Sequence, residues 1–224
     1  MAELFDTTCT ISLSAAADML AERRTGHRMA MQLWGDVEST VHRGARATVG
    51  CLWNVTASDL RTQTATLLVR SQHRPERRVP WATEQTTVET SIPARGAQVS
   101  FDVTIAAMYT PRSDVPEEWQ IELKKGADGS ARPPGQGLAY RNNQVPVPLD
   151  RLQTWAERKL DQIGIRGTVV AEPAAVARIK HGAKLSTARV RVTDVVTEDD
   201  LVAAVRNGIG KGRSYGLGLV VLDR

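Results

Sequence analysis

Apolar and polar residues alternate most strictly over residues 98–107, where Val99, Phe101, Val103 and Ile105 fall on one face. A period of two is typical of a β-strand that is buried on one side. Shorter segments with the same pattern predict further strands at residues 7–13, 48–55, 64–70, 167–179, 185–196 and 217–222.

Apolar residues at helical spacing predict helices between these strands. Residues 149–163 place several large apolar side chains on one helical face. The sequence Thr-Glu-Asp-Asp at residues 197–200 is a capping box for a helix over residues 201–207, which a glycine ends. Shorter helical segments are expected at residues 15–24 and 27–37.

The order of these elements fits the unit β-α-β-β-α-β twice, which predicts an α+β fold of tandem ferredoxin-like (RRM-like) domains. Proline, glycine, asparagine and charged residues dominate the middle of the chain. We therefore expect a first domain at residues 1–110, a loop-rich segment at 111–147 and a second domain at 148–224. The first strand of the second domain is either residues 98–107 or a segment near Leu138.

Composition and charge exclude several classes of protein. The 224 residues are 42% hydrophobic, and no apolar run approaches the roughly 18 residues of a membrane span. A cytoplasmic protein without a membrane partner is the expectation. Residues 150–224 carry 13 basic and 9 acidic side chains, which accounts for the whole net charge of +4 and predicts a polyanionic partner for this part. Cys9 and Cys51 form no C-x-x-C pair, and the histidines lack metal-ligand spacing, so neither a metal nor another cofactor is expected.

The most informative motif is N-G-I-G-K-G-R-S-Y-G-L-G-L at residues 207–219. A dinucleotide fingerprint would follow a strand and open a helix, whereas this loop follows a helix and enters a strand. A P-loop would place Ser or Thr after Lys211, where this chain has Gly212. We interpret the motif as a phosphate-binding loop; the alternative is a tight connection whose glycines serve only geometry. The expected phosphate-binding residues of this loop are Gly210, Lys211, Gly212, Arg213 and Gly216.

The C-terminal stretch G-I-G-K-G-R-S-Y-G-L-G-L-V-V-L resembles the signature of CRISPR-associated RNA-processing proteins, more narrowly the CasE family of type I-E Cascade. The segments H-R-M-A-M-Q-L-W, C-L-W-N-V and P-V-P-L-D-R-L-Q-T-W-A-E-R-K-L agree with this resemblance. It implies tandem ferredoxin-like folds and metal-independent cleavage of the CRISPR repeat at the base of its hairpin. The ribose 2′-OH then attacks the adjacent phosphate, leaving a 2′,3′-cyclic phosphate and a 5′-OH. The implied partners are the repeat hairpin of pre-crRNA and crRNA and the other Cascade subunits.

The chain departs from the family at its early helix. The family usually carries an aromatic residue there and a catalytic histidine three positions later, and this chain has His27 and Ala30 in those two places. Three explanations stay open. Ala30 is an inactivating change, His27 performs the catalysis, or the protein binds repeats without cutting them.

The resemblance also assigns the basic turn between the strands at 167–179 and 185–196 to the RNA stem. Its candidate phosphate ligands are Arg178, Lys180 and Lys184, followed by Arg189 and Arg191. Lys184 is in addition a candidate for the cation at the scissile phosphate. Taken alone, such a turn is a solvated hairpin tip. The rival functions are a non-catalytic RNA-binding subunit, an RNA-recognition module unrelated to CRISPR, and a small-molecule enzyme on the same fold.

Overall fold

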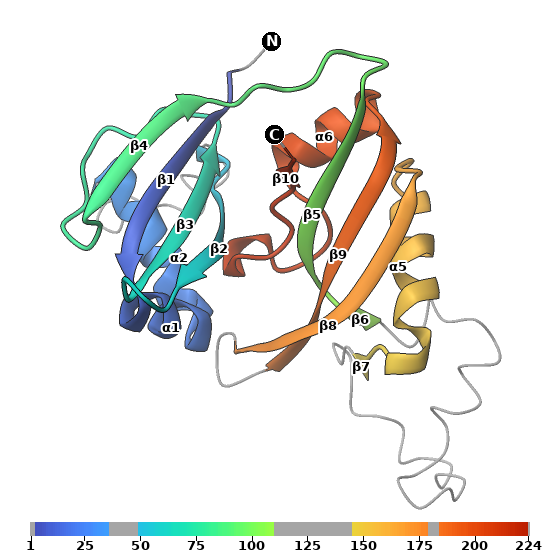
Figure 1. Ribbon diagram of the computed structural model, residues 1–224, viewed down its shortest axis with the longest axis horizontal. Coiled ribbons are helices and arrows are strands. Elements are labelled where there is room, and N and C mark those ends of the chain that lie inside the picture. Colours follow the sequence, from blue (N-terminus) through green and yellow to red (C-terminus); the bar gives the residue numbers. More distant parts are fainter. Residues whose placement is uncertain (1–2, 36–48, 110–144, 179–183, 224) are drawn as a thin grey trace, which may run out of the picture.

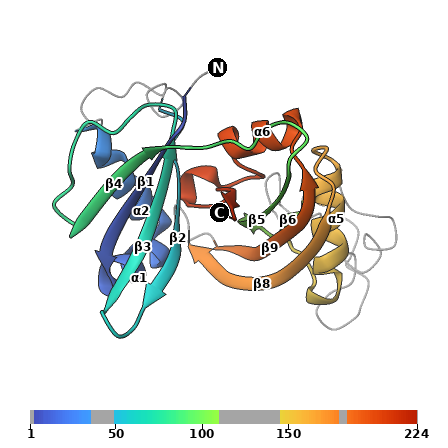
Figure 2. The same cartoon turned by 45° about the horizontal axis from the view of Figure 1, so that its top comes forward.

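The computed structural model describes residues 3–35, 49–109, 145–178 and 184–223. Two antiparallel four-stranded sheets lie side by side, one built by each half of the chain (Figure 1). Helices cover one face of each sheet, and the other faces turn toward the middle of the molecule (Figure 2). The α+β class and the tandem ferredoxin-like arrangement expected from the sequence are confirmed.

The first unit has the strand order β2-β3-β1-β4, which is the order of a ferredoxin-like sheet. Residues 72–83 cross from β3 to β4 without a helix, so this unit lacks its second crossover helix. The sequence pattern missed β4 because it is an edge strand whose side chains are mostly exposed. The elements are β1 (Phe5–Ser12), α1 (Leu13–Ala21), α2 (Arg23–Met31), a 3-10 turn η1 (Gln32–Trp34), β2 (Leu52–Asp59), β3 (Thr64–Ser71) and β4 (Glu84–Glu89).

The expected helix over residues 15–24 is divided at Glu22, which adopts an extended conformation with φ −125° and ψ 90°. The Glu22 side chain accepts a hydrogen bond from the backbone N–H of Arg24 at 3.1 Å and so caps α2. The second helix therefore begins at Arg23, four residues before the expected start, and it places Arg23 and His27 one turn apart on the same face.

The second unit has the order β10-β5-β9-β8 and is a complete ferredoxin-like unit with both crossover helices. One face of its sheet packs on α5 and α6 around a core that includes Phe101, Leu160 and Val190. The elements are β5 (Gln98–Ala106), η2 (Leu149–Arg151), α5 (Leu152–Asp161), β8 (Thr168–Arg178), β9 (Lys184–Val196), α6 (Asp199–Asn207), η4 (Arg213–Tyr215) and β10 (Val221–Leu222), with a small side sheet of β6 (Met108–Tyr109) and β7 (Val145–Pro146).

The expected limit of the first domain at residue 110 is wrong, because β5 pairs with β9 and β10 of the second unit. Of the two candidates for the first strand of that unit, the strand at 98–107 is the one used. Alternation identified the strand, but it carries no information about which sheet the strand joins. The first unit closes instead with β4, and the chain crosses between the units over residues 90–97.

Arg70 of β3 joins the two units. Its side chain is 2% exposed and forms a two-point ion pair with Asp6 of β1, with N–O distances of 2.7 and 2.8 Å. Its Nη1 also donates a hydrogen bond to the carbonyl of Val220 at 2.6 Å, which belongs to the second unit. A single buried guanidinium therefore pairs within one sheet and fixes that sheet against the other unit.

Candidate nucleic-acid interface

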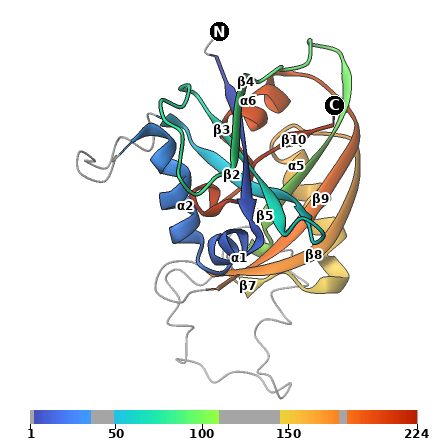
Figure 3. The same cartoon turned by 60° about the vertical axis from the view of Figure 1, so that its left-hand side comes forward.

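The two sequence-predicted parts of the site, the helix that carries His27 and the glycine-rich loop, meet at the junction between the units. Trp53 of β2 is fully buried between them. A Cβ atom at Gly26 of α2 would lie 2.4 Å from the Trp53 ring, and one at Gly216 would lie 2.9 Å from it. Only glycine fits at both places, so α2 and η4 lie side by side across this ring (Figure 3).

Arg23 strengthens the same junction, although nothing in the sequence marked it. Its side chain is 4% exposed, and its guanidinium lies 5.6 Å from the centre of the Trp53 ring. Nη1 donates a long hydrogen bond of 3.5 Å to the carbonyl of Gly216. Burial lowers the pKa of Arg23 to about 10, so the group stays positively charged at neutral pH. The pair Arg23-Arg24 has no periodicity or spacing that distinguishes its buried member from a solvated one.

His27 and Ala30 occupy different environments on α2. His27 is partly exposed, one helical turn from Arg23. Ala30 has no exposed surface and belongs to the core of the first unit, together with Met19 and Leu33. Ala30, which aligns with the histidine of the family, therefore faces the core, while the imidazole of His27 on the same helix lies nearer to solvent.

The glycine-rich loop divides into an exposed half and a buried half. Lys211 and Arg213 are exposed, and Arg213 donates a hydrogen bond to the carbonyl of Asn207 at 2.8 Å. The nearest described atom to a Cβ atom at Gly210 would be in Ile105, 4.0 Å away, whereas a Cβ atom at Gly212 would lie 2.9 Å from Leu217.

Gly216 is buried against Trp53 and has a packing role there, and its place among the RNA-binding residues stays a prediction. The expected strand at 217–222 is likewise shorter, because Gly216 and Gly218 adopt left-handed backbone conformations before β10 begins. The buried glycines of the motif therefore serve geometry, while the first half of the loop exposes its two cations, and phosphate binding by that half stays a prediction.

The basic turn of the second unit lies at the end of the long β8–β9 ribbon. Arg178 and Lys184 are the last paired residues of the two strands. Lys180 lies outside the described residues. Arg189 and Arg191 stand farther along β9 on the face away from α5 and α6, because their neighbours Ala188, Val190 and Val192 fill the core.

The two arginines of β9 differ in their partners. Arg191 donates to Asp102 at 2.8 Å and forms a second ion pair with Asp223. Among the residues that the structure describes, Arg189 forms no ion pair or side-chain hydrogen bond. Its neighbours across the sheet are Thr104 on β5 and Glu172 on β8. Arg189 therefore retains a positive charge that the fold does not neutralise.

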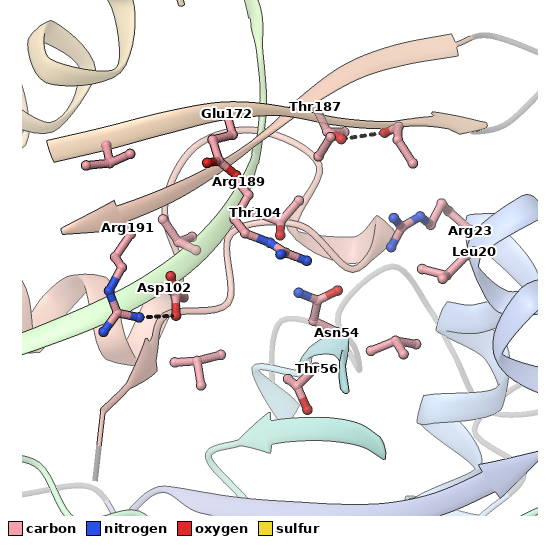
Figure 4. A pocket seen from close by; sticks show the side chains of 16 residues that line it. Leu20, Arg23, Asn54, Thr56, Asp102, Thr104, Glu172, Thr187, Arg189 and Arg191 are labelled. Atoms are coloured by element: carbon pink, nitrogen blue, oxygen red, sulfur yellow. Dashed lines mark hydrogen bonds and ion pairs between the residues drawn. The ribbon is translucent and has the colours of Figure 1, made fainter. Parts of the chain in front are cut away.

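A cavity of about 540 Å³ lies between the two units, beside the junction at Trp53. Figure 4 shows Arg189 extending into it from β9, with Asn54 of β2 beneath and Arg23 opposite. Within the described ranges, no group of three or more His, Cys, Asp or Glu side chains is arranged to hold a metal ion. No described helix has the length and apolar character of a membrane span.

Comparison with known proteins places these features in a family. A family model described as CRISPR associated protein matches residues 7–224. The chain resembles Cse3 of Thermus thermophilus bound to an RNA representing a pre-cleavage complex, with a TM-score of 0.67, 16% identity and coverage of 99% of this chain and 100% of that one. It also resembles the CRISPR-associated protein Cas6e of Escherichia coli K-12, with a TM-score of 0.58, 15% identity and 98% coverage of both chains. A chain of a CRISPR RNA-guided surveillance complex matches with a TM-score of 0.55, 15% identity and coverage of 97% of this chain and 98% of that one. No curated protein matches the sequence.

Proposed function

The chain belongs to the family of CRISPR-associated proteins, and from this premise we propose that it binds CRISPR repeat RNA and processes pre-crRNA as an endoribonuclease. The observation that carries the proposal is the junction at Trp53. There the helix of His27 packs against a loop that exposes Lys211 and Arg213. A group that can accept a proton and two cations that can contact phosphate thus belong to adjoining elements.

The reaction needs only groups of this kind. His27 accepts the proton of the ribose 2′-OH, and the freed oxygen attacks the adjacent phosphorus. The bond from phosphorus to the 5′-oxygen breaks, and a general acid protonates that oxygen as it leaves. The products are a 2′,3′-cyclic phosphate and a 5′-OH, with no change in oxidation state. Lys184 is the candidate for stabilising the extra negative charge on the phosphate.

RNA binding is assigned to the end of the β8–β9 ribbon and to the exposed half of the glycine-rich loop. Arg178, Lys180 and Lys184 would contact phosphates of the hairpin stem, while Lys211 and Arg213 would contact the strand next to the cut. Several phosphate contacts make release of the product slow, which supports a protein that stays on the crRNA hairpin as a Cascade subunit. Affinity is then expected to fall steeply with salt.

The alternative is a repeat-binding subunit that does not cut, and the buried Ala30 favours it. If catalysis depended on a histidine at position 30, this chain would lack that group, and its core would leave little room for one. The two functions share the RNA and the binding surface, so cleavage decides between them.

The test incubates the protein with the repeat hairpin of its own locus in EDTA and follows both binding and product ends. His27→Gln should bind like the unchanged protein and lose at least about a hundredfold in cleavage rate. His73→Gln is the matched control, because His73 is exposed and its hydrogen bonds within the described ranges, from Trp34 and Ser71, reach its backbone carbonyl and not its imidazole. It should change neither property.

Three other outcomes have distinct meanings. Binding without cleavage by the unchanged protein and by Ala30→His selects the non-cutting subunit. Cleavage that appears only with Ala30→His shows that Ala30 is an inactivating change and removes His27 from the chemistry. Equal affinity for the repeat and for a shuffled hairpin contradicts the CRISPR repeat as the ligand.

A further inference from the structure

The cavity between the units is not used by the reaction or by the hairpin contacts proposed above. Its walls come from both halves of the chain: β2 and the start of α2 on one side, and the open faces of β5, β8 and β9 on the other (Figure 4). Its volume of about 540 Å³ falls in the range of roughly 300–1,000 Å³ that is typical of small-ligand sites.

The charges of the cavity do not cancel. Arg191 is neutralised by Asp102 and Asp223 and contributes little free positive charge. Arg189, two residues earlier on the same face of β9, has no such partner among the described residues. Glu172 lies across the sheet from Arg189 and is the one carboxylate of the lining that no described ion pair engages. Two cations, Arg189 and Arg23, therefore face the cavity against a single free carboxylate.

Arg23 supplies an independent observation from the other unit. The side chain is 4% exposed, and its Nε is buried with no hydrogen-bond partner among the described residues. Its only described acceptor, the Gly216 carbonyl, is 3.5 Å away. A buried guanidinium normally has acceptors for its N–H groups, because burying a charge without them is costly. The free donor of Arg23 and the free charge of Arg189 thus line the same space from opposite walls.

We propose that this cavity binds the phosphate of one nucleotide between Arg189 and Arg23, with the Asn54 side-chain amide available to the sugar or the base. Guanidinium groups bind phosphate oxygens through paired hydrogen bonds, and an amide can donate and accept at once. The nucleotide belongs either to a single-stranded part of the RNA or to a free mononucleotide. The RNA source rests on the proposed function, whereas the mononucleotide source does not.

This assigns Arg189 to a different part of the RNA from the hairpin stem. An RNA strand that leaves the hairpin would enter the groove between the sheets, while the stem contacts the end of the β8–β9 ribbon. The cavity then contributes to discriminating an RNA with unpaired nucleotides from a bare hairpin, in addition to the contacts of Lys211 and Arg213 with the strand next to the cut.

The experiment compares two RNAs, the repeat hairpin alone and the same hairpin with single-stranded nucleotides at both ends, and adds AMP as a third ligand. The unchanged protein should bind the extended RNA more tightly than the hairpin. In Arg189→Gln the affinity for the extended RNA should fall about tenfold, or by about 1.4 kcal/mol, while the affinity for the hairpin alone stays unchanged. The salt slope for the extended RNA should fall by about 1.

Arg158→Gln is the matched control, since it removes the same charge from an exposed position on α5, which packs on the opposite face of the sheet. It should change neither RNA affinity. Arg23→Gln should repeat the loss seen with Arg189→Gln. Because Arg23 is buried and its replacement can disturb folding, the exposed Arg189 carries the decision.

The outcomes distinguish the two sources of the nucleotide, and they test the cavity separately from the proposed function. Calorimetric binding of AMP that weakens about tenfold in Arg189→Gln, with no advantage of the extended RNA, supports the site and identifies a free nucleotide. If the unchanged protein neither prefers the extended RNA nor binds AMP, or if Arg189→Gln retains both properties, the cavity is not a nucleotide site. If the unchanged protein does not bind the hairpin, that result contradicts the proposed function. The AMP measurement still decides whether the cavity is a nucleotide site.

Discussion

Replacing Arg70 by Met tests whether one buried guanidinium holds the two units together. The change removes both hydrogen bonds to the Asp6 carboxylate and the donor to the Val220 carbonyl. Asp6 is 5% exposed, so its charge would remain buried without a partner. Removing one member of a buried ion pair costs about 3–5 kcal/mol, and an unsatisfied buried carbonyl costs about 1–3 kcal/mol. Because the two losses share one side chain they do not simply add, and we expect a total near 4 kcal/mol.

The double variant Arg70→Met/Asp6→Leu divides this loss into its two parts. Without either charge, β1 and β3 face each other through apolar side chains, and the cost of the unpaired carboxylate disappears. The cost that remains, about 1–3 kcal/mol, belongs to the Val220 carbonyl and so to the contact between the units. The loss of stability in Arg70→Lys should lie between zero and that of Arg70→Met. The lysine keeps the charge, but an ammonium group cannot bond both carboxylate oxygens and the carbonyl in one plane.

Urea unfolding followed by tryptophan fluorescence measures both effects. Trp34, Trp53 and Trp81 report on the first unit and Trp155 on α5 of the second, so comparing the protein with its Trp155→Phe variant isolates the signal of the second unit. Arg70→Met should lower the midpoint of the first unit and make the two transitions less coincident. A loss below about 1 kcal/mol, or a double variant as unstable as the single one, would refute the reasoning, because the measured cost would then lie outside the range for breaking a buried pair.

Three further predictions concern the junction and the core. Gly216→Ala should destabilise the protein by about 1–3 kcal/mol more than Gly210→Ala in thermal unfolding, because both sites have positive φ but only position 216 meets Trp53; equal losses would contradict the packing role of Gly216. Burial raises the pKa of the Cys9 thiol from 9.0 to about 11, so its contribution to stability is complete below pH 9 and is lost as pH rises through about 11. Unfolding midpoints of the protein and of Cys9→Ala should therefore converge or cross over that interval, and a constant difference would exclude this linkage. Ala30→His should destabilise the first unit by about 1–3 kcal/mol in the same urea assay, since the new side chain enters a closed core; no loss would show that the helix can turn the imidazole outward.

Local signals were sufficient for most elements of the fold. Alternation over residues 98–107 identified β5, helical spacing identified α5, and the acidic start with Gly208 at the end identified α6. The predicted capping box is wrong, because Glu198 is the N-cap of α6 and its side chain makes no capping hydrogen bond. These signals depend on neighbours within a few residues, so they survive without knowledge of the tertiary structure. The weak points were elements with few buried side chains, such as β4, or elements divided by a single capping residue, as at Glu22.

The candidate site was predictable only where its residues form a motif. The glycine-rich loop is recognisable in the sequence because so many glycines alternate with cations over a short distance. The sequence could not distinguish Gly216, which packs on Trp53, from Gly210, which faces open space. Arg23 and Arg70 were not identified at all, since an isolated arginine has the same local pattern whether it is buried or solvated.

Local patterns in the sequence were enough to predict the α+β class, most of the strands and helices, the basic last third of the chain and the family to which its motifs point. Three features needed the folded structure: β5 completes the second sheet, Trp53 joins α2 to the glycine-rich loop, and Arg23 and Arg189 face one cavity. The physical reason is the range of the interactions. Periodicity and capping act within a turn or a strand, whereas sheet partners, buried charges and cavities depend on residues that approach one another only after the chain has folded.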